Sequence, residues 1–469
     1  MDTLHSLKAS SLLLQPQFTL INETPQPNMA VVIRDGRFTD VGPAEAVALR
    51  NPDLTAIELP QRLLMPGFID THNHLTQSYG KALAFGEPSE IFKRIWVPLE
   101  QHLTEEDLML SAQLASFEAL RGGFTTVCDA GTRSSAGLQA IDEAVSTVGI
   151  RCVLAQICHD LGQTPEQVRH TESQAQQHLS RYACHTLIHP SLAIAIPEAA
   201  SDGMLHHVAH QCREAGVPFQ VHVNEHMASV ERSLVARGRR PLEVLHHADA
   251  LGPELLAAHM TLVTPSELSL LSHHGAAVSY NPVASSWKGN AVAPALQMHV
   301  MGIRLGLGTD GTRSDGFRLI DAAETAQRLT LGMAVGDFSV GAGWTWLAMA
   351  SAWGADAAHL SNVTGRIATG LAADCLLIDI DVPELTPSWD LGWELVRLAH
   401  SRQIEAVMVQ GQLRLWQGWP LDWDARAMMA RVRKRAEAAV RAAPIQRIHS
   451  TSAQARSRDD RGPFGLARK

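Results

Sequence analysis

The stretch Pro66–Leu75, with the sequence PGFIDTHNHL, is an apolar run that ends in the pair His72 and His74. Residues i and i+2 of a strand point the same way, so these two imidazoles would face one point. Paired imidazole nitrogens suit a borderline metal ion such as Zn²⁺. A His-x-His pair also arises by chance in a structural strand, so the surrounding fold has to decide between the two interpretations.

Apolar, strand-like runs alternate with helix-like stretches through the middle of the chain. The strand-like runs are Leu63–Ile69, Thr125–Asp129, Arg151–Ile157, Phe219–Val223, Leu255–His259, Ala276–Tyr280 and Arg304–Leu307. Roughly eight βα units over about 300 residues predict an α/β fold, a (β/α)₈ TIM-like barrel. The alternative is a doubly wound sheet, but no G-x-G-x-x-G follows the first strand. In the barrel, His72 and His74 lie at the C-terminal end of the first strand, where barrel active sites are found.

Both ends of the chain are rich in short strands. Ala30–Ile33 and Arg37–Gly42 flank an Asp-Gly turn, and Ala373–Asp379 and Ile404–Val409 have the same character. These pieces predict a small β-sandwich built from both ends. The expected divisions are 1–62 and 369–425 for the two parts of the sandwich, 63–368 for the barrel, and 426–469 for a basic helix and a mobile tail.

Composition limits the class of protein. The 469 residues are 45% hydrophobic and 19% charged, which excludes wholesale disorder. Residues 426–469 carry 12 Lys/Arg and 3 Asp/Glu, a balance of +9, so a net charge of −9 leaves −18 on the first 425 residues. An acidic body argues against nucleic-acid binding there, and we interpret the basic tail as solvated or subunit-contacting. No apolar run is long enough to span a bilayer and no leader is evident, so we expect a soluble, cytoplasmic protein without a membrane partner.

Three further strand ends carry side chains of the kind found in metal-dependent enzymes. His222 ends one strand, and Glu225 follows three residues later, which pairs a nitrogen ligand with a carboxylate that can carry protons. His259 ends another strand, and the turn 305–311, LGLGTDG, exposes Asp310. Each feature is weak alone, but four such strand ends at barrel spacing predict one active site. Of the 23 histidines, these are the ones at chemically useful positions.

The motifs PGFIDTHNH, HVNE, AAHM and GLGTDG together resemble the signature series of the amidohydrolase superfamily, in its mononuclear aminohydrolase and triazine hydrolase-like branch. The similarity covers residues 30–411. It implies a (β/α)₈ barrel with a β-sandwich from both ends, hydrolysis of a carbon–nitrogen bond other than a peptide bond in a small molecule, and a homo-oligomer.

Carried over to this chain, the resemblance implies that His72, His74, His222 and Asp310 bind one divalent metal ion. Zn²⁺ is the first choice, and Fe²⁺, Co²⁺ and Mn²⁺ are the alternatives. Glu225 would be the proton shuttle, and Asp310 would accept a proton from the metal-bound water. His259 would orient that water or polarise a substrate oxygen. No bridging carboxylated lysine is evident, so a single metal ion is expected.

Two positions depart from the pattern of the adenosine-type deaminases. Tyr280 stands where many of them have the His of H-N-P-x-S-N, and Ile196 stands where P-H-A-P-Y has its His. Losing two polar contacts favours a less polar substrate. Trp96 and Trp287 would add apolar walls, although such residues also pack helices, and His189 would be a further substrate contact together with Tyr280.

The sequence thus predicts a hydrolase of an N-substituted urea, carbamate or thiocarbamate, similar to phenylurea and molinate hydrolases. The alternative is an aminohydrolase that releases ammonia from a purine, pyrimidine or triazine ring.

Overall fold

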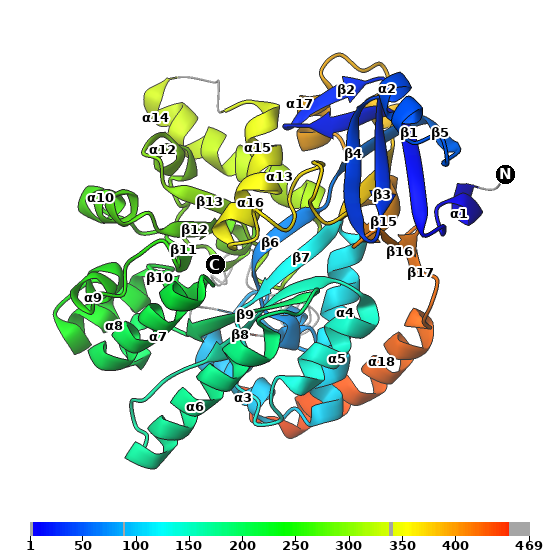
Figure 1. The fold of residues 1–469 in the computed structure, drawn as a ribbon. Coiled ribbons are helices and arrows are strands. Elements are labelled where there is room, and N and C mark those ends of the chain that lie inside the picture. Colours follow the sequence, from blue (N-terminus) through cyan, green and yellow to red (C-terminus); the bar gives the residue numbers. More distant parts are fainter. Residues whose placement is uncertain (1–2, 88–89, 337–340, 450–469) are drawn as a thin grey trace, which may run out of the picture.

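The computed structural model describes residues 3–87, 90–336 and 341–449, and the middle of the chain forms a parallel β-barrel (Figure 1). Its strands are β6 (Phe68–Asn73), β7 (Phe124–Asp129), β8 (Arg151–Ile157), β9 (Ile188–Ile194), β10 (Phe219–Val223), β11 (Leu255–His259), β12 (Ala277–Tyr280) and β13 (Arg304–Leu307). Each strand pairs in parallel with the next, and β13 lies against β6, so the barrel is nearly closed. The predicted barrel is confirmed.

Helices lie on the outside of the barrel, between its strands and after the last of them. They include α4 (Glu105–Arg121), α5 (Gln139–Val148), α6 (Pro165–Tyr182), α7 (Asp202–Ala215), α8 (Met227–Arg237), α9 (Pro241–His247), α10 (Pro265–His274), α11 (Pro282–Lys288), α12 (Ala295–Val300), α13 (Gly316–Gln327), α15 (Gly343–Met349) and α16 (Ala352–Ala357). Capping boxes at Thr104 and Thr164 start α4 and α6. Gly149 ends α5 at a φ of 77°, a left-handed conformation that favours glycine.

A separate mixed sheet joins the two ends of the chain, and it lies at the upper right of Figure 1. Its strands are β1 (Ser11–Ile21), β2 (Thr24–Pro27), β3 (Met29–Arg34), β4 (Arg37–Pro43), β5 (Ala56–Pro66), β14 (Cys375–Asp379), β15 (Ile404–Val409), β16 (Gln412–Trp416) and β17 (Trp419–Pro420). The strand β5 pairs with β1 on one side and with β14 on the other. Side chains of β3 and β15 share one apolar cluster although three strands separate them, which makes a sandwich of the sheet.

A buried ion pair links the sandwich to the end of the barrel at which the strands begin. Arg151 begins β8, and its guanidinium lies 2.9 Å from the Asp374 carboxylate, with both side chains almost fully buried. Arg151 also lies 3.2 Å from Nε2 of His189, the second residue of β9. This end of the barrel, where the strands begin, is opposite the end that carries the predicted site.

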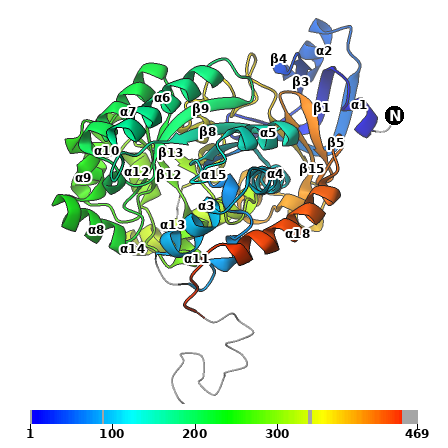
Figure 2. The same cartoon turned by 90° about the horizontal axis from the view of Figure 1, so that it is seen from below.

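The C-terminal helix α18 (Ala425–Ala442) packs along α4 (Figure 2). Arg435 of α18 lies 2.6 Å from Asp107 of α4. Within residues 444–449, which belong to the predicted tail, the backbone N–H of Gln446 donates to the carbonyl of Arg94 and the N–H of Ile448 donates to Glu87. Residues 450–469, the rest of that predicted tail, lie outside the described residues.

Among the helices of residues 3–87, 90–336 and 341–449, none has the length and apolar character that crossing a membrane requires.

Candidate metal centre and pocket

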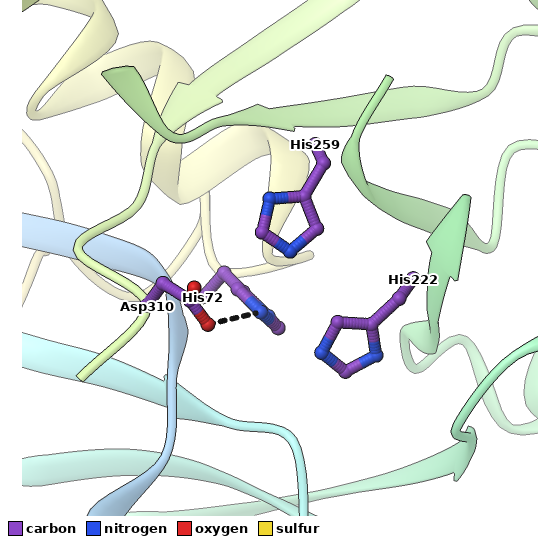
Figure 3. A group of neighbouring side chains, drawn as sticks. All are labelled: His72, His222, His259 and Asp310. Carbon is purple, nitrogen blue, oxygen red and sulfur yellow. Dashed lines mark ion pairs between the residues drawn. The ribbon is translucent and has the colours of Figure 1, made fainter. Parts of the chain in front are cut away.

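Side chains from four strand ends converge at the C-terminal end of the barrel. His72 of β6, His222 of β10, His259 of β11 and Asp310 after β13 place potential ligand atoms within 4.8 Å of one another. Figure 3 shows the three imidazoles and the carboxylate facing a common point. His74 belongs to the same cluster, since its Nε2 lies 3.3 Å from Asp310 Oδ1 and 3.2 Å from His222 Nε2. The structure therefore brings together all five of these residues that were chosen from the sequence.

A buried carboxylate fixes the two strand ends that carry His72 and Asp310. Asp70 is fully buried and accepts hydrogen bonds from the N–H of Thr309 at 2.9 Å and from its hydroxyl at 2.5 Å. Asp70 also accepts from the N–H of His72 at 3.2 Å. Burial raises the pKa of Asp70 to about 6, although these donors oppose the rise. Asp70 therefore ties β6 to the loop after β13, which the sequence alone did not indicate.

The backbone at the strand ends adopts conformations that ordinary residues rarely take. Asn224, His259 and Asp310 have φ angles of 51°, 77° and 59°. Such strained conformations persist only where the surrounding structure enforces them, and they concentrate at functional sites. Gly308 is equally constrained, because a Cβ there would lie 2.3 Å from Asn281 Oδ1 and 2.9 Å from His72 Cβ.

The donor atoms of this cluster fit a divalent metal ion. The Nε2 atom of His72 is buried, and within the described part of the chain it has no hydrogen-bond partner. Burial lowers the pKa of His74 and of His222, which keeps both imidazoles neutral and able to bind a metal. Three or four imidazoles and one carboxylate are a ligand set that Zn²⁺, Fe²⁺ and Co²⁺ accept.

Hydrogen bonds distinguish His222 from His259. Nδ1 of His222 lies 2.8 Å from the carbonyl oxygen of Ala195, so this nitrogen carries the proton and donates, and Nε2 keeps its lone pair. Nδ1 of His259 faces Nδ2 of Asn281 at 3.2 Å, while Oδ1 of Asn281 accepts from the hydroxyl of Ser279. The Asn281 amide therefore donates to His259, which places the His259 proton on Nε2. Nε2 of His222 is therefore available to bind a metal, whereas Nε2 of His259 carries an N–H that can donate a hydrogen bond.

A buried lysine joins the two carboxylates of the site. Lys288 Nζ lies 2.7 Å from Glu225 Oε1 and 2.5 Å from Asp310 Oδ2. Burial alone would raise the pKa of Glu225, but His259 and Lys288 outweigh it and hold this pKa below its ordinary value. Burial lowers the pKa of His259 to about 4, with Glu225 opposing the shift. Lys288 was missed in the sequence, where a lysine at the end of a short helix has no distinguishing signal.

A pocket opens above the cluster. Its floor includes His74, His222 and Asp310, and its walls include the apolar side chains Ile91, Phe92, Trp96, Ile196 and Trp287. On another side it is lined by Arg232, which pairs with Glu90 at 2.9 Å and with Glu198 at 3.0 Å. The site is thus a largely apolar cavity with polar groups at the metal cluster and along one side.

Two of the four expected substrate contacts line this pocket and two do not. Trp96 and Trp287 lie in its walls. Tyr280 is fully buried, and its hydroxyl donates to the carbonyl of Ala323 and accepts from Gln327 in the helix layer. His189 contacts Arg151 at the opposite end of the barrel. The structure therefore corrects the expected placement of Tyr280 and His189.

The Amidohydrolase family model matches residues 63–414 of the chain. A 5-methylthioadenosine/S-adenosylhomocysteine deaminase of Syntrophobacter fumaroxidans is 28% identical over 411 residues, which are 86% of this chain and 92% of that protein. A 5'-deoxyadenosine deaminase of Methanopyrus kandleri is 29% identical over 388 residues, covering 82% of this chain and 88% of the relative.

Solved structures share the fold. An adenosine deaminase from Xanthomonas campestris with bound zinc has a TM-score of 0.83 and 22% identity, and the match covers 92% of this chain and 98% of that one. An atrazine chlorohydrolase from Arthrobacter aurescens TC1 complexed with zinc has a TM-score of 0.77 and 19% identity, with 92% and 100% covered.

Proposed function

This chain belongs to the amidohydrolase family, and on that premise we propose that it is a metal-dependent aminohydrolase that releases ammonia from a nitrogen heterocycle of the purine class. The observation that carries the proposal is the cluster of His72, His74, His222, His259 and Asp310, with the Glu225 carboxylate beside it at the floor of a pocket. The relatives named deaminases, which match this chain over more than four fifths of its length, support ring deamination in particular.

In this proposal His72, His74, His222 and Asp310 hold one divalent metal ion, with Zn²⁺ as the first choice and Fe²⁺, Co²⁺ or Mn²⁺ as alternatives. Such an ion lowers the pKa of a water molecule towards 7 and stabilises the charge that develops on a substrate. His259 does not need to be a ligand, because its Nε2–H is available to donate to an oxygen or nitrogen of the substrate.

Glu225 moves the proton. Its Oε1 is occupied by Lys288 at 2.7 Å, and its Oε2 faces His259 Nε2 at 3.9 Å. Oε2 is therefore the oxygen that can take one proton from the attacking water and give it to a ring nitrogen. It can then take the second proton, from the hydroxyl added to the ring carbon, and give it to the leaving amine, which departs as ammonia. The lowered pKa of Glu225 keeps this carboxylate ionised before the water attacks.

A second candidate is hydrolysis of an N-substituted urea or thiocarbamate, the reaction favoured on the sequence alone. One observation favours it: Ile91, Phe92, Trp96, Ile196 and Trp287 give the pocket a mostly apolar wall. The named relatives are deaminases and do not support this reaction, so ring deamination is the first candidate and urea or thiocarbamate hydrolysis the second.

The test is a substrate panel on the zinc-loaded enzyme. Adenosine-type nucleosides, amino-triazines, phenylureas and a cyclic thiocarbamate are compared by measuring released ammonia and released substituted amine separately. Ammonia from the purine group supports the proposal, whereas an aniline or cyclic amine as the sole product would replace it with the second candidate.

Glu225→Gln is the matched variant for this panel. We expect this variant to retain one metal ion per chain, because Glu225 is not among the proposed metal ligands. We expect its kcat to fall by about 10²- to 10⁴-fold. Metal analysis by mass spectrometry and steady-state kinetics check both parts. A near-normal kcat would remove Glu225 from the proton path.

A further inference from the structure

Lys288 binds one oxygen of each of two carboxylates and leaves the other oxygen of each free of the ammonium. Of Asp310, Oδ2 binds Lys288 Nζ at 2.5 Å, while Oδ1 lies 3.3 Å from Nε2 of both His72 and His74. Of Glu225, Oε1 binds Lys288 at 2.7 Å, while Oε2 is the oxygen near His259. Each carboxylate therefore gives one oxygen to the ammonium and turns the other towards the histidine cluster.

The position of Lys288 is well defined. It is the last residue of α11, which Gly289 ends at a φ of 70°, and its side chain is 15% exposed. Asn290 follows two residues later, and its amide lies 3.5 Å from the same oxygen, Glu225 Oε1. One short segment after β12 thus controls the outer oxygen of Glu225.

The positive charge of Lys288 compensates the two carboxylates. Two buried carboxylates that approach one point repel each other unless a cation lies between them, and removing that cation leaves both uncompensated. Because the ammonium occupies only the outer oxygens, a metal ion at the histidine cluster could use Asp310 Oδ1 without displacing Lys288.

We propose that Lys288 is a positioning residue of this site, whose ammonium holds the outer oxygens of Glu225 and Asp310 so that the inner oxygens face the histidine cluster. The catalytic part of this inference rests on the proposed function, since it assigns Glu225 to the proton path. The electrostatic part does not depend on any substrate.

The first experiment tests whether Lys288 and a bound metal ion compensate the same carboxylates, and it requires no activity assay. The melting temperature of the full-length protein is recorded with chelator and with Zn²⁺, for wild type and Lys288→Met. Zn²⁺ supplies positive charge that the variant lacks, so we expect the zinc-induced rise to exceed that of wild type by at least about 2 °C. Lys288→Arg, which keeps a cation, should restore the wild-type rise.

Lys81→Met is the matched control, because Lys81 pairs with Glu118 outside the pocket and is also partly buried. It should lower the melting temperature equally with and without zinc. If Lys288→Met also left the zinc-induced rise unchanged, Lys288 would be an ordinary structural ion pair and the proposal would be overturned.

The second experiment separates binding from turnover. With the best substrate of the panel, we expect Lys288→Met to lower kcat about 10²-fold while KM changes by less than about threefold. Methylammonium should partly restore kcat of Lys288→Ala, whereas tetramethylammonium, which has no N–H donor, should not. An effect confined to KM would overturn the positioning role.

The outcomes of the two experiments distinguish a failure of the proposed function from a failure of the role of Lys288. If wild type hydrolysed no substrate of the panel, the proposed function would fall, while a larger zinc-induced rise in Lys288→Met would still uphold the link between Lys288 and the two carboxylates.

Discussion

At the scale of single residues, the protonation of His259 depends on Asn281. The Asn281 amide donates to Nδ1 of His259 at 3.2 Å and is oriented by the hydroxyl of Ser279, so Nε2 of His259 carries the proton and faces the site. A side chain of the same shape that accepts instead of donating would move that proton to Nδ1.

Asn281→Asp makes this change. We expect kcat to fall about 10²-fold because His259 loses its donor towards the substrate. Metal content should equal that of wild type, since His259 is not among the proposed ligands. Kinetics and metal analysis on the purified variant check the prediction, and an unchanged kcat would show that the proton on His259 has no role in turnover.

Side-chain alternation explains why Tyr280 is not a pocket residue. The hydroxyl of Ser279 points inward, where it contacts Thr71 and Asn281. The next residue of a strand points to the opposite face, so Tyr280 faces the helix layer and bonds Ala323 and Gln327. Comparison with the H-N-P-x-S-N motif predicted that Tyr280 contacts the substrate. The alternation of side chains along the strand instead predicts that Tyr280 points out of the barrel.

At the scale of elements, the end of the chain supports the wall of the pocket. The carboxylate of Glu87, which lines the pocket and is fully buried, accepts from Arg94 at 2.9 Å and from the backbone N–H groups of Ile448 and His449 at 3.0 and 3.3 Å. Arg447 adds a fourth bond at 3.2 Å. Residues 447–449 thus lie against Glu87, and Ile445 packs in one apolar cluster with Ile91 of the pocket wall.

Glu87→Gln should loosen this contact, because a neutral amide binds two guanidinium groups less strongly than a carboxylate does. We expect KM to rise by a factor of about 3 to 10 with little change in kcat. Trypsin should also cleave after Arg447 faster than in wild type. Glu437→Gln is the control, since Glu437 pairs with the exposed Arg441 on α18 away from the pocket. Equal cleavage rates in the two variants would contradict this role of Glu87.

The sequence predicted the elements better than the contacts between them. Strands such as Arg151–Ile157 and Leu255–His259 were recovered because a buried parallel strand is a short apolar run with a clear end. Histidines at such ends were recovered because their location in a barrel implies a shared edge. Lys288, Asn281 and Glu87 were not, because their partners lie 63, 22 and up to 362 residues away and only the folded chain brings them together.

For the protein as a whole, the buried neutral His178 contributes to the loss of stability in acid. His178 of α6 is buried, and its Nε2–H donates to the carbonyl of Leu154 in β8 at 2.8 Å. Burial lowers the pKa of His178 to about 4, from 6.5 in the unfolded chain. Between these two pH values the unfolded chain binds more protons than the folded one, so stability falls as the pH is lowered from 6.5 to 4.

Across the whole interval between the two pKa values, this shift lowers the free energy of unfolding by about 3 kcal/mol. His178→Gln keeps an N–H donor but does not titrate, so the difference in melting temperature between pH 7.5 and pH 4.5 should shrink relative to wild type. His206→Gln, at an exposed position, should leave it unchanged. Measurements in chelator exclude loss of metal as a cause, and equal pH dependence of wild type and His178→Gln would show that His178 does not contribute.

The predicted homo-oligomer stays a prediction, and sedimentation of the purified protein would test it.

The pairing of β5 with β14 also governs the order in which this protein can be completed during synthesis. The strand β5 ends at Pro66, and its partner begins at Cys375, about 310 residues later. At ribosomal rates of 5–20 residues per second, β5 waits roughly 15 to 60 s for that partner. If β5 pairs with β1 before β14 is made, its other edge has no partner during that time and is open to pairing with other nascent chains. The speed of translation is therefore expected to contribute to how long each new chain is open to aggregation.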